Sequence, residues 1–302
     1  MKCILIYNPN SGKDRSKELN YIISRLKEKY DIVDLAMTSN DENALLNEYK
    51  ILDYDNIIIM GGDGTFNNIV SIISKYDKRP ILGYIPSGTA NDNAKNFGIS
   101  KNYKKAIDII LNGKSIKHDV GMINDQYFVY AVATGNYANV SYKAKQRIKR
   151  ILGRIAYIIE GLKQIHKIVK VEGKLIIDGN EIPFSCPLIL VMNSISIGGF
   201  PCNKKRGHLN DGTFDVIIVK KYFSALSAVT RFLFFGIGKK DHTIYYDLYR
   251  AKEIQICVSS EVCWTKDGEL GPSGNIKITN LPSHIEVIVN NKKTRHFLEK
   301  RG

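Results

Sequence analysis

The 302-residue sequence predicts an α/β protein with an N-terminal doubly wound parallel sheet and a second, mostly antiparallel β domain. Residues 1–120 alternate apolar runs with amphipathic segments, which is typical of a parallel sheet covered on both faces. From about residue 121, short runs rich in Val, Ile, Tyr and Phe follow one another between turn signals. A hydrophobic fraction of 44% is enough for a sizeable core.

The first 120 residues are expected to alternate strands with helices, because each apolar run is followed by a segment of helical periodicity. The expected elements are strand 4–7, helix 16–30, strand 32–36, helix 41–49, strand 56–60, helix 66–74, strand 81–85 and helix 103–111. Ligands of such sheets bind beyond the carboxyl ends of the strands. The segments that follow these strands are therefore candidate binding sites.

The rest of the chain is expected to form the β domain, in which turns such as Asp178-Gly179-Asn180 separate short strands. Its expected strands are 127–133, 169–177, 188–192, 214–219, 253–258, 276–278 and 285–289. Two helical segments, at about 141–166 and 224–235, interrupt them. The boundary between the domains is expected near residue 120.

Cysteine usage and charge limit the classes of protein. The five cysteines are scattered and include no CxxC pair, so neither a disulfide framework nor a zinc site is indicated, and a cytoplasmic location is expected. Because the chain reads straight into a strand, no signal peptide is expected, and no apolar run reaches the roughly 18 residues that span a bilayer. A net charge of +14 favours nucleic acid, anionic lipid or an anionic cofactor as a partner.

Two glycine turns are the most informative motifs. Gly61-Gly62-Asp63-Gly64-Thr65 follows the strand at 56–60, and Pro86-Ser87-Gly88-Thr89-Ala90-Asn91-Asp92 follows the strand at 81–85. Backbone N–H groups at a strand-to-helix junction favour phosphate. A carboxylate such as Asp63 beside phosphate needs a bridging metal ion or a proton, which points to phosphoryl transfer from a nucleotide. The alternative is a pair of ordinary turns without a ligand.

The β domain contains two acidic turns, Lys266-Asp267-Gly268-Glu269 and His208-Leu209-Asn210-Asp211-Gly212-Thr213. Gly268 permits a tight turn that brings two carboxylates near one place, although an exposed hairpin tip would look the same. A carboxylate flanked by free carbonyls suits a hard divalent cation, and an Asx turn is the alternative for Asp211.

The segment 143–170 is strongly basic and carries apolar residues at helical spacing. It is either an interfacial helix that faces anionic lipid or an ordinary packed helix with a solvated charged face.

The motifs, in chain order, are Asn8-Pro9 with Ser11-Gly12-Lys13, Gly61 to Asn67, Pro86 to Asp92, Gly153 to Tyr157, Leu209 to Gly212 and Asp267 to Glu269. In order and spacing this set resembles the soluble diacylglycerol kinase and bacterial lipid kinase family over nearly the whole chain. The resemblance implies an ATP-binding domain, residues 1–120, rejoined by the tail 290–302, and a β-sandwich lipid-substrate domain, residues 121–289.

The resemblance also implies roles for particular residues. Diacylglycerol would be the leading acceptor of the γ-phosphoryl group of ATP, and phosphatidic acid the product. Glu269 would be the general base with Asp267 beside it, and which of the two takes the proton stays open. The residues implied to contact ATP are Asn8, Pro9, Asn10, Ser11, Gly12, Thr38, Gly62, Asp63, Gly64, Thr65, Phe66, Asn67, Asn68 and Thr89.

Two metal roles are expected. Mg²⁺ would bridge the phosphates of ATP beside Asp63, and a second, structural Mg²⁺ would be held by the Asp211 side chain with the carbonyls of His208 and Thr213. The sequence departs from the family at Asn68, where Glu is usual, and at Asn93, where Phe is usual. The first change removes a charge close to the phosphates, so the metal count there is open.

A lipid substrate implies peripheral contact of the protein with the inner face of the membrane. A homodimer is compatible with the resemblance. Nucleic acid is not an expected partner. The rival predictions are an NAD kinase-like enzyme, whose family shares the Gly-Gly-Asp-Gly-Thr turn, and a catalytically silent protein that binds a nucleotide or nucleic acid. The 86–92 segment and the 267–269 pair fit lipid kinases better, and no aromatic-interleaved RNA motif occurs.

Overall fold

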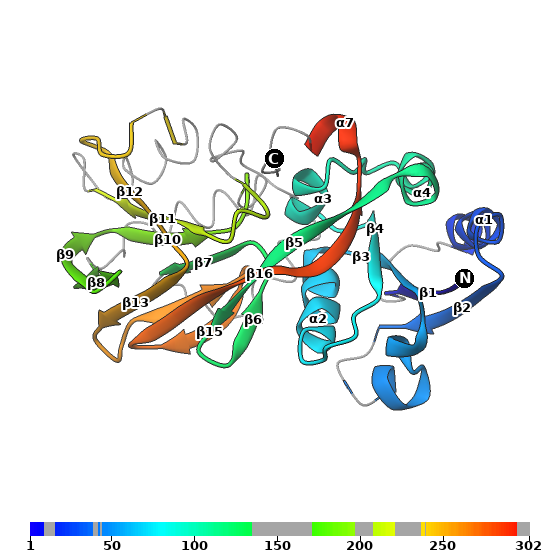
Figure 1. Ribbon diagram of the computed structural model, residues 1–302, viewed down its shortest axis with the longest axis horizontal. Coiled ribbons are helices and arrows are strands. Elements are labelled where there is room, and N and C mark those ends of the chain that lie inside the picture. Colours follow the sequence, from blue (N-terminus) through cyan, green and yellow to red (C-terminus); the bar gives the residue numbers. More distant parts are fainter. Residues whose placement is uncertain are drawn as a thin grey trace. The chain divides into compact units, whose positions relative to one another are not determined.

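The computed structural model describes residues 1–8, 16–38, 42, 44–134, 171–196, 208–220, 237–238 and 240–294 (Figure 1). The chain divides into two compact units. Unit 1 comprises Met1–Val120, Leu209–Asp211 and the chain from Pro282, and unit 2 comprises Gly121–His208 and Gly212–Leu281. The predicted helical segments 141–166 and 224–235 and the basic segment 143–170 lie outside the described residues.

Unit 1 contains a parallel sheet whose strands follow the order β2 (Ile32–Met37), β1 (Lys2–Tyr7), β3 (Asn56–Gly61) and β4 (Ile81–Pro86). The far end of β16 (Ile276–Val289) adds to it through Val287, which pairs in parallel with Leu82. The central strands β1 and β3 are apolar and buried, because they have neighbours on both edges and helices on their faces.

Helices pack against both faces of this sheet, as the sequence predicts. A Cβ at Gly83 of β4 would lie 3.3 Å from the Ile110 side chain, and the next residue, Tyr84, contacts Phe66 with ring centroids 5.0 Å apart. Successive strand residues point to opposite faces, so these two helices cover opposite sides. The helices of unit 1 are α1 (Ser16–Leu26), α2 (Asp63–Ile73), α3 (Asp92–Asn96), α4 (Tyr103–Asn112) and α7 (Asn291–Thr294).

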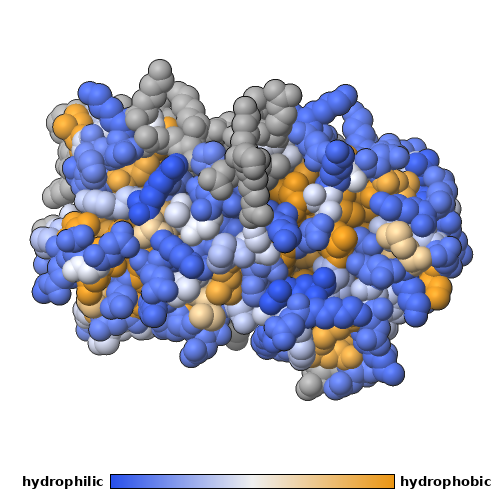
Figure 2. Space-filling model, in the orientation of Figure 1, coloured by the Kyte–Doolittle hydropathy of each residue, from blue (hydrophilic) through white to orange (hydrophobic). Residues whose placement is uncertain are grey.

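The strand β2 lies at the edge of the sheet and is the least buried strand of unit 1. Ile32, Leu35 and Met37 are 42%, 41% and 49% exposed. Elsewhere the visible surface of the described residues is largely hydrophilic, with separate apolar areas (Figure 2). Among the helices in the described ranges, none is long and apolar enough to cross a bilayer.

Unit 2 is built from two antiparallel sheets. One has the order β12 (Tyr246–Ala251), β11 (Phe214–Val219), β10 (Leu188–Met192), β7 (Ala131–Thr134), β14 (Cys263–Lys266) and β15 (Glu269–Ser273). The other contains β9 (Asn180–Cys186), β8 (Val171–Ile177), β13 (Glu253–Val258), the first part of β16, β6 (Gln126–Phe128) and the end of β5 (Lys114–Ile123).

The two sheets of unit 2 share one apolar core. Phe128 of β6 stacks on Phe214 of β11 with ring centroids 5.4 Å apart, and Trp264 of β14 is fully buried in the same cluster. Alternate residues of the strands face this core, as in a β-sandwich. The predicted class, a parallel-sheet N-terminal part with an antiparallel second part, is confirmed.

Several predicted elements differ in their bounds. Helix α1 ends at Leu26, and α2 begins at Asp63, three residues before the predicted start. The helix expected at 41–49 is described as a short π-helix, Ala44–Glu48, which is followed by the 3₁₀ turn Ile51–Asp53. The separate strands expected at 276–278 and 285–289 form one continuous strand, β16.

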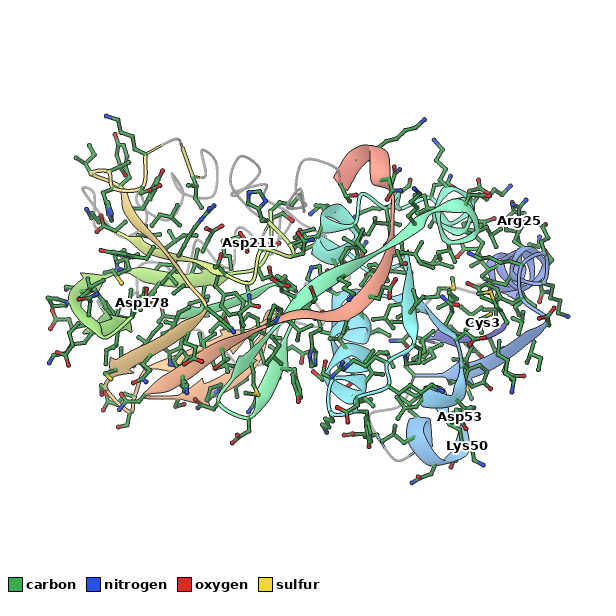
Figure 3. All side chains as sticks on the ribbon, viewed as in Figure 1. Cys3, Arg25, Lys50, Asp53, Asp178 and Asp211 are labelled. Carbon is green, nitrogen blue, oxygen red and sulfur yellow. The ribbon has the colours of Figure 1, made fainter. Side chains whose placement is uncertain are left out.

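Two of the differences concern the strands β5, β6 and β7. The strand β5 was not predicted because it contains Lys117, His118 and Asp119, although the last two are fully buried. The expected strand 127–133 is divided into β6 and β7, since the backbone between them turns to the Asp267 carboxylate. The turn predicted at Asp178-Gly179-Asn180 is confirmed: Asp178 and Gly179 have positive φ, and Asn180 begins β9 (Figure 3).

His118 is a buried titratable group in unit 1. Its ring is fully buried, lies edge-on to Phe97 with centroids 5.4 Å apart, and donates from Nδ1 to the Asp119 carbonyl. Burial lowers the pKa of His118 to about 4. The unfolded chain, with a pKa near 6.5, therefore takes up a proton more readily than the folded protein between these two pH values.

We predict that the free energy of unfolding falls as the pH drops from about 6.5 to about 4, with His118 contributing up to about 3 kcal/mol of that loss. Urea unfolding at several pH values measures it. The loss should be smaller in His118→Gln, which does not titrate, and unchanged in His242→Gln, which alters an exposed histidine. Equal acid destabilisation in wild type and His118→Gln would contradict the prediction.

Candidate functional site

The two glycine turns lie side by side at the carboxyl ends of β3 and β4. The Ser87 N–H donates to the Gly61 carbonyl at 2.7 Å. A Cβ at Gly88 would lie 2.6 Å from the Gly62 Cα, closer than any real side chain allows. Gly88 is therefore required by the close approach of two backbones, since any side chain there would separate the turns.

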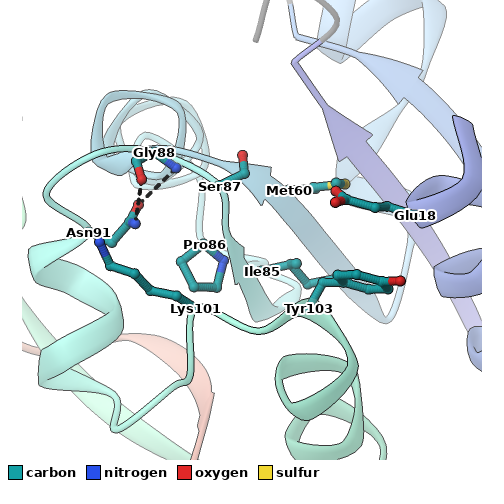
Figure 4. A pocket seen from close by; sticks show the side chains of 9 residues that line it. All are labelled: Glu18, Met60, Ile85, Pro86, Ser87, Gly88, Asn91, Lys101 and Tyr103. Atoms are coloured by element: carbon teal, nitrogen blue, oxygen red, sulfur yellow. Dashed lines mark hydrogen bonds between the residues drawn. The ribbon is translucent and has the colours of Figure 1, made fainter. Parts of the chain in front are cut away.

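The second turn is closed by its own asparagine. The Asn91 Oδ1 accepts from the Gly88 N–H at 3.0 Å, and the Asn91 Nδ2 donates to the Gly88 carbonyl at 2.7 Å (Figure 4). Tyr84, fully buried, donates from its hydroxyl to the Gly61 carbonyl at 3.2 Å. The Gly88 N–H is thus used within the turn, so any phosphate contact of this turn must come from its other groups.

Asp63 is the first residue of α2 and is partly buried. Its Oδ1 accepts the Asn93 N–H at 3.0 Å. Burial raises the pKa of Asp63, and the hydrogen bond from the Asn93 N–H opposes this rise. The negative charge of the nearby Asp92 raises the pKa of Asp63 further. Asp92 itself is buried and pairs with Lys95, with Nζ and Oδ1 2.9 Å apart.

The remaining predicted ATP contacts, apart from the buried Asn67, divide into four groups. Asn8 and Thr38 follow β1 and β2, where their N–H groups donate to the Met60 and Tyr7 carbonyls of the neighbouring strands. Gly64 and Asn68 are exposed on α2, Thr89 is exposed in the second turn, and Thr65 is partly buried. Phe66 is fully buried among Tyr84 and Phe97, so its side chain belongs to the core. Pro9, Asn10, Ser11 and Gly12 lie outside the described residues.

A pocket of about 260 Å³ opens beside the second turn (Figure 4). Met60, Ile85 and Pro86 at the ends of β3 and β4 contribute apolar walls. The other lining residues are Glu18, Ser87, Gly88, Asn91, Lys101 and Tyr103. The Lys101 ammonium donates to the Thr89 carbonyl at 2.9 Å, which ties the start of α4 to the turn.

Glu18, Lys101 and Tyr103 are not among the site residues predicted from the sequence. Their positions in the sequence could have indicated them, because Glu18 lies in the first turn of α1, and Lys101 and Tyr103 lie at or just before the start of α4. In a doubly wound sheet the helices that follow strands begin at the carboxyl edge, where ligands bind.

In unit 2, Asp267 and Glu269 differ sharply in environment. The Asp267 carboxylate accepts the N–H groups of Val129, Tyr130 and Ala131 at 2.7, 2.9 and 3.0 Å. Asp267 is 8% exposed and has a φ of 51°, while Glu269 is exposed at the start of β15. Burial raises the pKa of Asp267 to about 6, against the effect of the three N–H donors.

The predicted magnesium ligands His208, Asp211 and Thr213 are all partly buried (Asp211 is labelled in Figure 3). Leu209, beside them in the chain, is fully buried, and its carbonyl accepts the Asp119 N–H at 3.0 Å. Within the described ranges no cluster of three or more His, Cys, Asp or Glu side chains occurs. One carboxylate with main-chain carbonyls is a donor set that suits a hard cation retaining several waters.

We predict that Gly88→Ala lowers the free energy of unfolding by about 1–3 kcal/mol, because the methyl group would overlap the Gly62 backbone. The matched control is Gly62→Ala, whose Cβ would lie at an ordinary 3.4 Å from Gly88, and it should change the stability by no more than about 0.5 kcal/mol. Urea unfolding of the three proteins measures both. Equal stability of the two variants would contradict the close contact.

Comparison with known proteins identifies the family. Residues 2–123 match the diacylglycerol kinase catalytic domain, and residues 130–289 match the YegS C-terminal NAD kinase beta sandwich-like domain. A diacylglycerol kinase of Bacillus subtilis (strain 168) is 32% identical over 298 residues, which cover 97% of this chain and 98% of that protein. One of Staphylococcus carnosus (strain TM300) is 31% identical, over 94% of this chain and 93% of that one.

Solved structures of similar proteins have the same fold. A crystal structure from Bacillus anthracis str. Sterne, of a protein assigned to the diacylglycerol kinases, superposes with a TM-score of 0.81 and 26% identity, over 96% of this chain and 98% of that chain. The order and spacing of the motifs, the fold and these relatives agree from one end of the chain to the other. The chain belongs to the diacylglycerol kinase family, whose members are lipid kinases that transfer phosphate to a hydroxyl group.

Proposed function

We propose that the protein transfers the γ-phosphoryl group of ATP to the hydroxyl of diacylglycerol and so forms phosphatidic acid. The observation that carries the proposal is the contact between two glycine turns at the carboxyl ends of β3 and β4, with Asp63 at the start of α2. The relatives named diacylglycerol kinase, similar over nearly the whole chain, support the choice of acceptor.

The nucleotide phosphates bind at the start of α2. Gly62 is the N-cap of this 11-residue helix and makes no side-chain cap hydrogen bond, so the N–H groups of the first turn are left for an anion. The proposed ATP contacts are Asn8 to Gly12, Thr38, Gly62 to Asn68 and Thr89, of which Phe66 takes part only through its backbone, because its side chain is buried.

The carboxylate of Asp63 fits a role in holding Mg²⁺ with ATP, because hard cations prefer carboxylate oxygens. One of its oxygens, Oδ1, is held by the Asn93 N–H, which fixes the orientation of the carboxylate. When bound, Mg²⁺ neutralises charge on the phosphates during transfer. Asp63 then has to be ionised, and its raised pKa makes the use of Mg·ATP weaken in acid.

Glu269 takes the proton of the acceptor hydroxyl, and Asp267 holds the turn. The exposure of Glu269 leaves its carboxylate accessible to a substrate, whereas both Asp267 oxygens accept backbone N–H groups. The two carboxylates are therefore proposed to have different roles, which the sequence left open.

The acceptor lipid implies that the protein works in the cytoplasm at the inner face of the membrane, in peripheral contact with it. Attraction of about 1 kcal/mol per basic residue near an anionic leaflet supports such contact for a chain with a net charge of +14. A homodimer is compatible with this role.

We predict that Glu269→Gln lowers kcat by about 10²–10⁴-fold with an unchanged KM for ATP and unchanged stability. Asp267→Asn should lower activity together with stability, because an amide group would face backbone N–H donors. Glu261→Gln, which alters an exposed carboxylate elsewhere in unit 2, is the control and should keep wild-type activity. Wild-type turnover in Glu269→Gln would exclude Glu269 as the base.

The acceptor is tested with radiolabelled ATP and the full chain. Diacylglycerol in mixed micelles should be phosphorylated, whereas NAD⁺ should not. Phosphorylation of NAD⁺ without phosphorylation of lipid would establish the rival enzyme class. Filter binding to DNA and RNA at rising salt tests the non-catalytic rival, which requires tight, salt-sensitive binding without turnover.

We predict that Asp211 has a structural role through a bound Mg²⁺. Asp211→Ala should lower the melting temperature and the activity, and added Mg²⁺ should stabilise the wild type more than the variant, because the carboxylate supplies the only charged ligand of the proposed set. Thermal melts over a Mg²⁺ series without nucleotide measure the effect. An equal gain from Mg²⁺ in both proteins would refute the site.

A further inference from the structure

Asn93 is a polar side chain in a fully buried position. It is the second residue of α3, and its exposure is 0%. The end of α3 packs on α2 through aromatic rings, since Phe66 of α2 contacts Phe97, the residue that follows α3. A carboxamide in such a place is costly unless it forms hydrogen bonds.

Both hydrogen bonds that Asn93 donates go to the first turns of α2. Its Nδ2 donates to the Asn67 Oδ1 at 2.8 Å, and its backbone N–H donates to the Asp63 Oδ1 at 3.0 Å. Asp63 and Asn67 are four residues apart on one helix, so they lie on the same face of α2. Asn93 therefore holds two neighbouring side chains at the proposed phosphate site.

The hydrogen bond from Asn93 uses the oxygen of the Asn67 side-chain amide and not its nitrogen. The Asn67 Oδ1 is occupied, and the Asn67 Nδ2 is buried without a hydrogen-bond partner among the described residues. The Asn93 Oδ1 is buried in the same way. Unsatisfied buried polar groups are rare in native proteins and need an explanation such as a ligand or a catalytic role.

We propose that Asn93 is a positioning residue of the phosphoryl-transfer site. It fixes the Asn67 amide so that Nδ2 is left to donate to a phosphate oxygen of bound ATP. An N–H donor suits an anionic oxygen and cannot ligate Mg²⁺. The inference rests on the proposed function for the identity of the ligand, and it goes further by assigning a positioning role to Asn93.

The first test is Asn93→Leu, a substitution of similar size that removes the hydrogen bond but leaves the backbone N–H to Asp63. The dissociation constant of Mg·ATP should rise by about fivefold, the order expected for one neutral hydrogen bond. Isothermal titration calorimetry with Mg·ATP on the full chain measures it, and urea unfolding shows whether the variant is folded.

A double-mutant cycle separates positioning from packing. If Asn93 acts through Asn67, the effect of Asn93→Leu on Mg·ATP affinity should disappear in an Asn67→Leu background. If the two effects instead add, or if Asn93→Leu changes stability alone, the positioning role is refuted. Lys104→Leu, on the exposed side of α4, is a control that should bind Mg·ATP as the wild type does.

The orientation of the Asn67 amide is tested by Asn67→Asp, which keeps an acceptor for Asn93 but loses the N–H donor. Weaker binding of Mg·ATP supports a contact with phosphate, whereas equal or tighter binding would show that Asn67 serves the metal and would overturn the proposal. These outcomes do not depend on the acceptor lipid, because they measure only the binding of Mg·ATP by variants of Asn93 and Asn67. The proposed function is tested separately, and it fails if the wild-type protein does not phosphorylate diacylglycerol.

Discussion

The candidate site depends on the contact between two peptide backbones. Gly62 and Gly88 lie at the carboxyl ends of adjacent parallel strands, where a Cβ at Gly88 would meet the Gly62 Cα at 2.6 Å. The contact is possible because Gly88 has no side chain, whereas a Cβ at Gly62 would lie at an ordinary 3.4 Å from the Gly88 Cα. It brings the start of α2 to the loop that carries Thr89, and every proposed phosphate contact of these two segments depends on that distance being short.

Hydrogen bonds from buried side chains stabilise this contact between the two turns. The Tyr84 hydroxyl donates to the Gly61 carbonyl of the first turn, Asn91 closes the second turn on Gly88, and the Asn93 side chain donates to Asn67 of α2. Each of these side chains is buried, so its hydrogen bonds compete little with water. The site is therefore preorganised by polar groups that do not themselves face solvent, which leaves the exposed groups of the two turns for the ligand.

The acidic turn of unit 2 follows the same principle. Asp267, at a φ of 51°, accepts N–H groups from Val129 and Tyr130 between β6 and β7 and from Ala131 at the start of β7. The Tyr130 hydroxyl donates to the Asp267 carbonyl at 2.7 Å. One buried carboxylate thus joins two turns and leaves Glu269, two residues on, at the surface. The Asp267-Gly268-Glu269 turn thus contains one carboxylate that holds the structure and one that is accessible to a substrate.

The sequence alone determined the fold class, the parallel sheet of the first 120 residues and the two glycine turns, because apolar periodicity and glycine spacing are local properties of the chain. The family was indicated by the resemblance of its motifs in order and spacing. The sequence could not give β5, whose His118 and Asp119 look exposed in sequence but are buried. Nor could it distinguish Asp267 from Glu269, or assign a role to Asn93. Those differences depend on residues distant in the chain, Val129 to Ala131 for Asp267 and Asn67 for Asn93, and only the tertiary structure brings them within hydrogen-bond distance.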